Sequence, residues 1–255
     1  QQASYGAYGA ASLHWTDWLR MDAGLRIDSY HFKVDSSLGV NSGSANDSIA
    51  SPKLALVFGP WSKTEYFLNA GNGFHSNDAR GTTIRVDPND GVTPVERVDP
   101  LVRAFGAEVG LRTAIIPDVQ LSAALWMLDL DSELLFTGDG GSTEPSRASR
   151  REGLEVGAYY KPLDWVVIDA DVAWTRARYT DPDPVGDRIP NAVESVASVG
   201  VALTRTTGWF GGARLRYFGP APLVEDDSVR SDSTLQVNLE GGYRFSRHLS
   251  VSVTV

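Results

Sequence analysis

The segment NAGNGFHSNDARG, at residues 69–81, gathers the side-chain types of a nucleophilic hydrolase, because His75, Ser76 and Asp78 lie close together in the chain. In such an enzyme the base must reach the nucleophile across space, while a third group orients the base from behind. Near neighbours in one stretch of chain do not provide that geometry. The glycines and small polar residues instead suit a strand that turns into a loop. We therefore predict no catalytic residue in this segment.

Residue types that bind metals or cofactors are present elsewhere, but without the required spacing. The four histidines stand apart, and none of them forms a motif such as HExxH. The stretch GNGFHS lacks the third glycine and the following helix of a dinucleotide site. Acidic stretches at 181–187 and 225–232 could hold Ca²⁺, but they lack the ligand periodicity of a calcium loop, so solvated loops are the preferred interpretation. We expect no metal, no cofactor and no enzyme activity.

Composition excludes several further classes of protein. The 255 residues carry a net charge of -9 and include no cysteine, which argues against a nucleic-acid partner and excludes disulfides and thiolate sites. No apolar run approaches the roughly 20 residues of a membrane-spanning helix. The N-terminus has neither an initiator Met nor the layout of a signal peptide, so we expect that the chain begins inside a longer precursor or was cut.

Apolar and polar residues alternate with period two along most of the chain, which predicts an all-β protein. In RAFGAEVGLRTAI one face carries Phe105, Ala107, Val109 and Leu111, and the other carries Gly106, Glu108, Gly110 and Arg112. The same alternation occurs in LRMDAGLRID, WFGGARLRYF and TLQVNLEGGYRF. Each such strand has one apolar face and one face with full charges and glycines. Alternation alone also fits a soluble β-sandwich.

Three further features favour a transmembrane barrel. Several alternating stretches run about 11 to 16 residues, against a usual strand of about 5 to 6 and the 9 to 11 needed to cross a bilayer at a tilt. Short connections alternate with long ones rich in Gly, Ser, Asp and Pro, as in barrels with tight periplasmic turns and long extracellular loops. Five of the seven tryptophans lie in or beside the short connections, where an amphipathic ring suits the membrane interface.

The alternation predicts about twelve antiparallel strands in up-and-down order. We place them at 3–15, 19–34, 49–58, 64–73, 101–115, 119–137, 151–161, 165–179, 193–205, 208–218, 232–245 and 249–255. The last is too short to span an apolar band of about 25 Å, so we expect the chain to stop before the natural end of that strand. A β-propeller is the rival architecture, but its blades hold four short strands each and carry a repeated signature.

Charged residues occupy the middle of many strands, opposite the apolar face. A basic side chain that faces lipid costs about 2–4 kcal/mol, so these charges should face a polar lumen. A barrel much wider than 8 strands has room for a channel or a plug. We expect wall-to-wall and wall-to-plug pairing rather than direct contact with a substrate. The predicted lumen-facing wall residues are Glu108, Arg112, Glu155, Asp169, Asp171, Arg214, Arg216, Glu240 and Arg244.

An ordered series of short motifs resembles the C-terminal half of the β-barrel of a TonB-dependent outer-membrane receptor. The series consists of EYFLNAGNGFHSNDARG with its Gly73-Phe74 pair, VDPLVRAFGAEVGLRT with Asp99-Pro100, and SRREGLEVGAYYKPLDWVVIDADVAWTRARY. The resemblance covers nearly the whole chain. Many siderophore-type members carry a basic residue and a proline soon after the Gly-Phe pair, whereas this chain has HSND, so the resemblance does not identify an iron chelate as the ligand.

The resemblance implies one domain, residues 1–255, that forms roughly half of a barrel of about 22 strands in the outer membrane of a Gram-negative-type bacterium. It also implies membrane lipid, an N-terminal plug and TonB as partners, the last two through parts outside this chain. The implied function is TonB-dependent active uptake of a metal chelate or another small organic ligand. The loop residues expected to contact that ligand from the extracellular mouth are His75, Asn77, Asp78 and Arg80.

Two alternatives remain open from the sequence. A passive porin or an autotransporter-type translocator could form a complete barrel from about twelve strands. A barrel hydrolase with its site at the outer rim is the enzymatic alternative.

Overall fold

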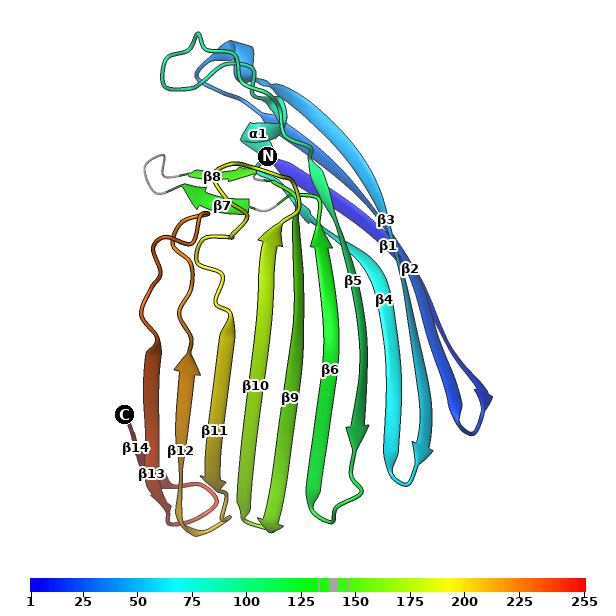
Figure 1. Cartoon of the computed structure of the whole chain (residues 1–255), viewed down its shortest axis with the longest axis vertical. Helices are drawn as coiled ribbons and strands as arrows, with labels where there is room; N and C mark the ends of the chain where they lie inside the picture. The colour runs from blue at the N-terminus through cyan, green and yellow to red at the C-terminus, as the bar shows by residue number, and fades with distance from the viewer. Residues whose placement is uncertain (133, 138–141, 146) are drawn as a thin grey trace.

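The computed structural model describes residues 1–132, 134–137, 142–145 and 147–255, and its main feature is one antiparallel sheet of twelve strands. The strands of this sheet are β1 (Gln2–Thr16), β2 (Leu19–Val34), β3 (Gly43–Trp61), β4 (Thr64–Ser76), β5 (Leu101–Thr113), β6 (Val119–Leu130), β9 (Ser149–Leu163), β10 (Val166–Tyr179), β11 (Ser195–Leu203), β12 (Gly208–Phe218), β13 (Thr234–Arg244) and β14 (Ser250–Thr254). The sheet curls into an open trough with β1 and β14 at its two edges (Figure 1).

Consecutive strands pair with one another, so the wiring is up-and-down as predicted. The one interruption is a separate two-stranded sheet of β7 (Leu134–Thr137) and β8 (Ser142–Pro145), inserted between β6 and β9. Short connections at 17–18, 62–63, 114–118, 164–165, 204–207 and 245–249 form one rim. The long connections form the other rim, at 35–42, 77–100, the described parts of 131–148, 180–194 and 219–233, which confirms the predicted alternation.

Several predicted strand boundaries differ from the structure, and two of them were wrong by six residues or more. The strand expected at 119–137 ends at Leu130, where pairing with β9 stops, and residues 134–137 pair with 142–145 instead; residue 133 lies outside the described part of the chain. The third strand begins at Gly43 rather than at 49, because its polar first half pairs with β2 up to Val34. Cross-strand polar contacts there, such as Ser48 Oγ to Ser29 Oγ at 3.0 Å, replace the apolar alternation on which the prediction relied.

Among the residues that the structure describes, helical structure is confined to two short pieces in the long connections. These are a 3₁₀ turn (Gly39–Asn41) and α1 (Ala79–Thr83). No helix in the described ranges is long and apolar enough to cross a membrane.

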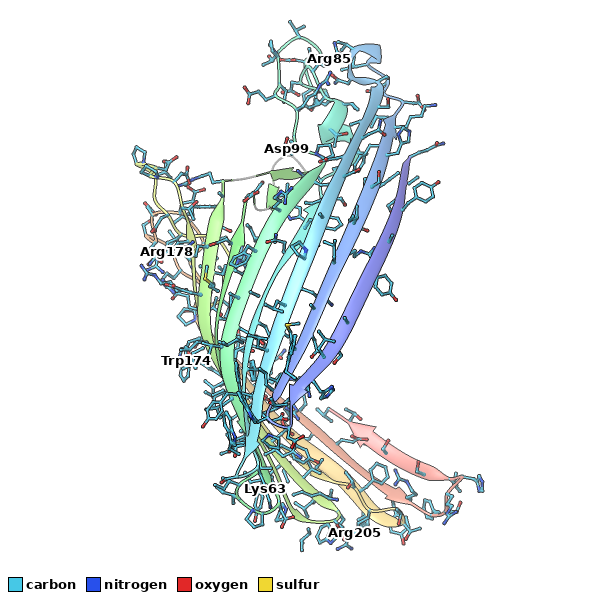
Figure 2. The ribbon with its side chains drawn as sticks, turned by 90° about the vertical axis from the view of Figure 1, so that its right-hand side faces the viewer. Lys63, Arg85, Asp99, Trp174, Arg178 and Arg205 are labelled. Carbon is cyan, nitrogen blue, oxygen red and sulfur yellow. The ribbon has the colours of Figure 1, made fainter. Side chains whose placement is uncertain are left out.

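The pairing register divides the sheet into an apolar face and a polar face. The apolar face carries Leu25, Leu54, Leu68, Val109, Leu125, Leu154, Trp174, Val199, Leu215, Val237 and Leu239, which are linked through the ladders. These side chains have no protein layer over them: Leu125 is 57% exposed and Val237 58%. In Figure 2 both edge strands lie on one side of the curve, and Trp174 lies on the opposite, convex side. The apolar face is therefore the outer face of the trough.

Buried side chains gather near the long-connection rim rather than between layers of sheet. One cluster consists of Phe32, Ile49 and Leu101, with Phe74 packed against it. This cluster closes a fork in the sheet, because β3 and β4 pair only as far as Lys53 and Gly71.

The fork follows from Pro52, which has no backbone N–H to continue the β3–β4 ladder. Beyond it, β3 stays paired with β2, and β4 stays paired with β5.

Candidate functional site: the polar face and its loops

The ladders place the nine predicted wall residues together on the polar face. Glu108 pairs in register with Asn69 and Trp126, and the alternation continues strand by strand to Glu240 and Arg244 on β13. The register shifts lie beside short connections, at His14/Thr16, Phe58/Trp61 and Val166/Ile168, so they do not move a mid-strand residue to the other face.

Several charges on the polar face pair with a neighbouring strand. Arg112 Nε lies 2.6 Å from Glu65 Oε2, and the Asn69 amide donates to Glu108 Oε1 at 2.6 Å. Arg214 reaches across β11, and its Nη2 lies 2.7 Å from Asp169 Oδ1. These contacts fit the predicted wall-to-wall pairing.

Other charges on this face keep capacity for a further partner. The carboxylates of Glu155 and Glu240 make no hydrogen bond or ion pair within the described part of the chain. Asp171 has only a long contact of 3.4 Å with Ser198 Oγ. Arg216 bonds to Asn238 Oδ1 at 2.8 Å, and Arg244 bonds to the carbonyl oxygen of Arg205 at 2.7 Å. The polar face is thus satisfied in part by its own strands.

Glycines on the polar face make room for bulky neighbours to lie flat on the sheet. A Cβ at Gly200 would lie 2.7 Å from Arg214 Nη2, so the bare backbone lets that side chain cross to Asp169. A Cβ at Gly153 would lie 2.7 Å from the Trp126 ring. The same relation joins Gly110 to Phe67 and Gly242 to Phe210. Because cross-strand aromatic rings lie flat over these strand glycines, they project little from the polar face.

The predicted ligand-binding residues lie where β4 becomes the 77–100 connection. His75 is near the end of the β4 ladder and pairs in register with Val102. Asn77 is only 3% exposed, and its amide donates to the Asp99 carbonyl oxygen at 2.7 Å. Asn77 therefore anchors the loop to the Asp99-Pro100 element rather than presenting its amide outward.

Asp78 and Arg80 form a local unit at the start of α1. The Asp78 carboxylate accepts from the Arg80 backbone N–H at 2.8 Å and lies 2.6 Å from Arg80 Nη2. The hydrogen bonds from Arg80 hold the pKa of the Asp78 carboxyl below its usual range. The Arg80 side chain remains 78% exposed. Arg80 is thus the member of the predicted set that a soluble molecule could reach most easily.

Asn41, a residue that the sequence patterns do not single out, fixes the 77–100 connection to the 35–42 connection. Its side chain accepts from the backbone N–H groups of Arg85 and Val86 at 2.9 and 3.0 Å and donates to the Val86 carbonyl at 2.9 Å. Asn41 is 5% exposed. No local signal in the sequence pairs it with residues more than forty positions away.

The acidic stretches at 181–187 and 225–232 are exposed loops as expected, and arginines pair with several of their carboxylates. Asp181 pairs with Arg147, Asp187 with Arg178, and Asp227 with Arg188. Among the residues that the structure describes, no group of three histidine or carboxylate side chains could hold a metal ion.

Five of the seven tryptophans lie at the short-connection rim as predicted, namely Trp15, Trp18, Trp61, Trp165 and Trp209. Trp18 stacks on Trp61 at 6.1 Å, and Trp209 meets Tyr243 edge to face at 5.2 Å. The Arg205 guanidinium lies over the Trp165 ring, 4.1 Å from its centroid. These rings make a band at one level of the sheet, as at a membrane interface.

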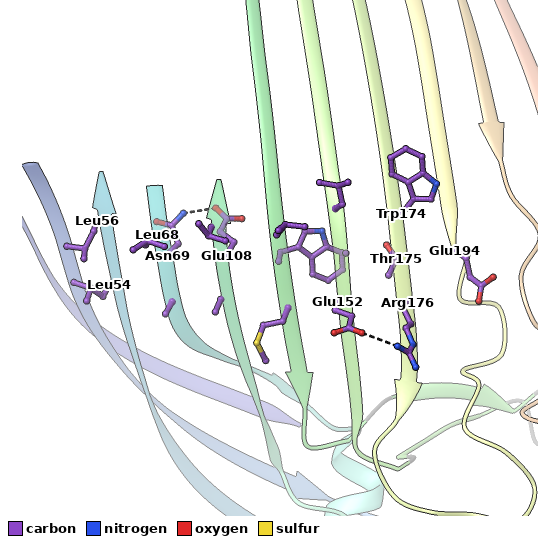
Figure 3. A pocket seen from close by; sticks show the side chains of 18 residues that line it. Leu54, Leu56, Leu68, Asn69, Glu108, Glu152, Trp174, Thr175, Arg176 and Glu194 are labelled. Atoms are coloured by element: carbon purple, nitrogen blue, oxygen red, sulfur yellow. Dashed lines mark hydrogen bonds and ion pairs between the residues drawn. The ribbon is translucent and has the colours of Figure 1, made fainter. Parts of the chain in front are cut away.

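A shallow hollow of about 970 Å³ crosses the middle of the sheet from β3 to β10 (Figure 3). Most of its lining side chains belong to the apolar face, among them Leu54, Leu68, Val109, Leu125, Leu154 and Trp174. At its border the Glu152–Arg176 pair closes at 3.6 Å.

Several solved structures share this architecture. Three similar solved structures are "Copper transporter OprC" (19% identity, TM-score 0.76), the ferric yersiniabactin uptake receptor FyuA from Yersinia pestis (18%, 0.76) and the ferric-catecholate import receptor Fiu from K12 E. coli (16%, 0.72). Each match covers 99% of this chain and 40 to 41% of the other, so the chain spans about two fifths of those proteins. At these identities the likeness shows the fold alone.

No curated protein sequence matches the chain. The family model described as "TonB dependent receptor-like, beta-barrel" matches residues 1–255, the whole chain. This chain belongs to the β-barrel family of TonB-dependent receptors.

Proposed function

We propose that this chain forms part of the barrel wall of an outer-membrane receptor that takes up a nutrient into the periplasm by TonB-dependent transport. The observation that carries the proposal is the two-faced sheet: a continuous apolar outer face on twelve up-and-down strands, in a chain of this family. Because the chain spans about two fifths of its structural neighbours, the plug and the contact with TonB belong to the proposal rather than to the described residues.

In this proposal the apolar face lies against outer-membrane lipid and the polar face lines the lumen. The exposure of Leu125 and Val237 supports the first part, because side chains of that size are stabilised by hydrocarbon and not by water. The free carboxylates of Glu155 and Glu240 support the second, because a plug could supply their missing partners. The Trp-lined rim then faces the periplasm, and the long connections face outward.

Residues 1–255 would be one incomplete domain of a larger barrel. In support, β1 and β14 do not pair with each other in the described structure, although a closed barrel of twelve strands needs that ladder. Further strands between these two edges would satisfy the backbone groups that both now expose.

The ligand is proposed to be a metal chelate or another small organic molecule that arrives from the long-connection side. The names of the three structural neighbours concern copper, ferric yersiniabactin and ferric catecholate. His75, Asp78 and Arg80 are the proposed contacts, with Asn77 holding their loop in place. The exposure of the Arg80 guanidinium supports this role, since guanidinium groups bind oxyanions and carboxylates well.

Uptake measured in cells that make the receptor containing this chain would test the proposal. The probes are radioactive copper and radioactive ferric catecholate, each with and without an uncoupler of the proton gradient. Active transport predicts that accumulation of at least one probe falls to background when the gradient collapses. Arg80→Ala should lower that accumulation, whereas Arg85→Ala, an exposed arginine of the same loop, should not.

Probe accumulation that is the same with and without the uncoupler would contradict the proposal and support a passive porin. Failure of both probes to enter would contradict a metal-containing ligand.

A further inference from the structure

Three segments at the long-connection rim of β9 to β13 are joined by charged side chains. They are residues 147–148, the 180–194 connection and the 219–233 connection. We call the joining residues the rim clasp: Arg147, Asp181, Arg188, Glu194, Glu225, Asp227 and Arg230.

Four members of the rim clasp form a closed ring. Arg188 Nη1 lies 2.5 Å from Glu194 Oε1, and Glu194 Oε2 lies 2.5 Å from Arg230 Nη2. Arg230 Nη1 lies 2.6 Å from Asp227 Oδ1, and Asp227 Oδ2 lies 2.9 Å from Arg188 Nη2. Each carboxylate therefore holds both arginines, one from each connection. Both arginines use two separate nitrogens, which fixes the planes of their guanidinium groups.

Arg147 ties the third segment to the other two. Its Nε lies 2.7 Å from Asp181 Oδ1, and its Nη1 lies 2.9 Å from Glu225 Oε2. The same Nη1 donates to the Gly186 carbonyl oxygen at 3.0 Å. The guanidinium also lies over the Tyr179 ring, 4.4 Å from its centroid. Only 19% of the Arg147 side chain is exposed, so water competes weakly for these bonds.

Backbone hydrogen bonds also join the two connections, and a small apolar cluster holds the 180–194 connection against β10. The backbone N–H of Arg188 donates to the Glu225 carbonyl at 3.0 Å, and that of Asn191 donates to the Pro222 carbonyl at 2.8 Å. Ile189 is 1% exposed and packs with Ala177 and Tyr179 of β10. The 180–194 connection is therefore held both to the 219–233 connection and to β10.

From this geometry we propose that the 180–194 and 219–233 connections, with residues 147–148, form a single preformed body that moves only as a unit. Isolated surface ion pairs contribute little, but each of the four ring members has two partners, so the ring resists the loss of any one contact. Any loop rearrangement on ligand binding would then either be confined to other connections or move the whole rim clasp as one body. The inference does not rest on the transport function, because a passive barrel with this rim would hold the same clasp.

Hydrogen exchange in the detergent-solubilised receptor would test the rim clasp. Arg230→Met keeps the apolar stem but removes the charges that bind Glu194 and Asp227. Amide exchange should rise by at least about tenfold in both the 219–233 and the 180–194 connections, including the Arg188 amide, because the two open together. Amides of β10 to β13 should exchange as before, which shows that the barrel is still folded. Arg85→Met removes the same charge from the 77–100 connection and should leave both clasped connections unchanged.

Faster exchange in 219–233 alone would overturn the proposal, because the connections would then open independently. So would unchanged exchange in both. A double-mutant cycle of Arg188→Met and Arg230→Met gives a second test. In a closed ring the two changes together should raise exchange by clearly less than the product of their separate effects. A full product of the separate effects would mean that the arginines act apart.

Discussion

At the scale of single residues, the 69–81 segment is built to shape a loop. Asp78 caps α1 and binds Arg80, while Asn77 is buried against the carbonyl of Asp99. Both side chains replace backbone partners that the chain loses when it leaves the β4–β5 ladder. The order in which strand, anchor and cap follow one another explains why small polar residues occur here in a row.

The Asp78 cap should fail in acid. Its pKa is lowered in the folded loop by the Arg80 hydrogen bonds, so its contribution is complete at neutral pH, begins to decline near the unfolded value of about 3.9, and is lost as the pH falls through the lowered folded pKa. Asp78→Ala should cost about 0.5–2 kcal/mol of local stability at pH 7. Asp78→Asn keeps a capping oxygen but cannot titrate. Amide exchange of α1, corrected for intrinsic rates, should be faster at pH 3 than at pH 6 in the natural chain and nearly independent of pH in Asp78→Asn. Equal pH dependence in both would contradict the assignment.

At the scale of strands, the polar face depends on pairs of a glycine and a bulky neighbour. Phe67 lies over Gly110, Trp126 over Gly153, and Arg214 over Gly200. The strands can therefore carry large side chains inward without building a rough wall. Gly153 is constrained from both neighbouring strands, because a Cβ there would also lie 2.5 Å from the carbonyl oxygen of Trp174 on β10.

Gly153→Ala should consequently destabilise the sheet. The added Cβ forces the Trp126 ring or the β10 backbone to shift, at a cost of about 1–3 kcal/mol. Gly241→Ala is the matched control, since a Cβ at that strand position meets no atom within 4 Å. Urea titration of the membrane-inserted receptor should show a lower midpoint for Gly153→Ala and an unchanged or higher midpoint for Gly241→Ala. Equal midpoints would show that the ring can move at no cost.

At the scale of the whole molecule, the two faces of the sheet are stabilised in different ways. The buried clusters are few and lie near the long-connection rim, while most large apolar side chains point outward from the middle of the sheet. A chain of this composition is stable only if another phase covers that face. The polar face, in contrast, is satisfied in part by pairs such as Arg214–Asp169 and Asn69–Glu108.

Substitutions at two neighbouring residues of β6 test which face of the sheet is the outer, apolar one. Leu125→Arg puts a charge on the outer face and should cost about 2–4 kcal/mol of folding in the membrane. Ala124→Arg puts the same charge on the polar face, opposite Glu155 in register, and should be tolerated. The fraction of receptor that migrates as the folded, heat-modifiable form in outer-membrane extracts should fall for Leu125→Arg alone. A loss confined to Ala124→Arg would reverse the assignment of the faces.

The faces and the up-and-down order could be predicted from sequence because both depend on local patterns. A period of two assigns Glu108 and Val109 to opposite faces without knowledge of any partner. Contacts between distant segments could not be predicted in this way. Arg230 meets Glu194 across 36 positions, and the Arg85 amide meets Asn41 across 44. The first half of β3 could not be predicted either, because polar residues such as serine and asparagine continue the ladder there without apolar alternation.

The glycine pairs of the polar face have a consequence for how this wall can change over evolution. A larger residue at position 153 becomes acceptable only if the ring at 126 shrinks, and position 200 is tied to 214 in the same way. Substitutions at the two members of each pair should therefore be inherited together. Related sequences ought to show correlated exchange of small and large residues across neighbouring strands, while outward positions such as 109 and 125 drift independently among aliphatic types.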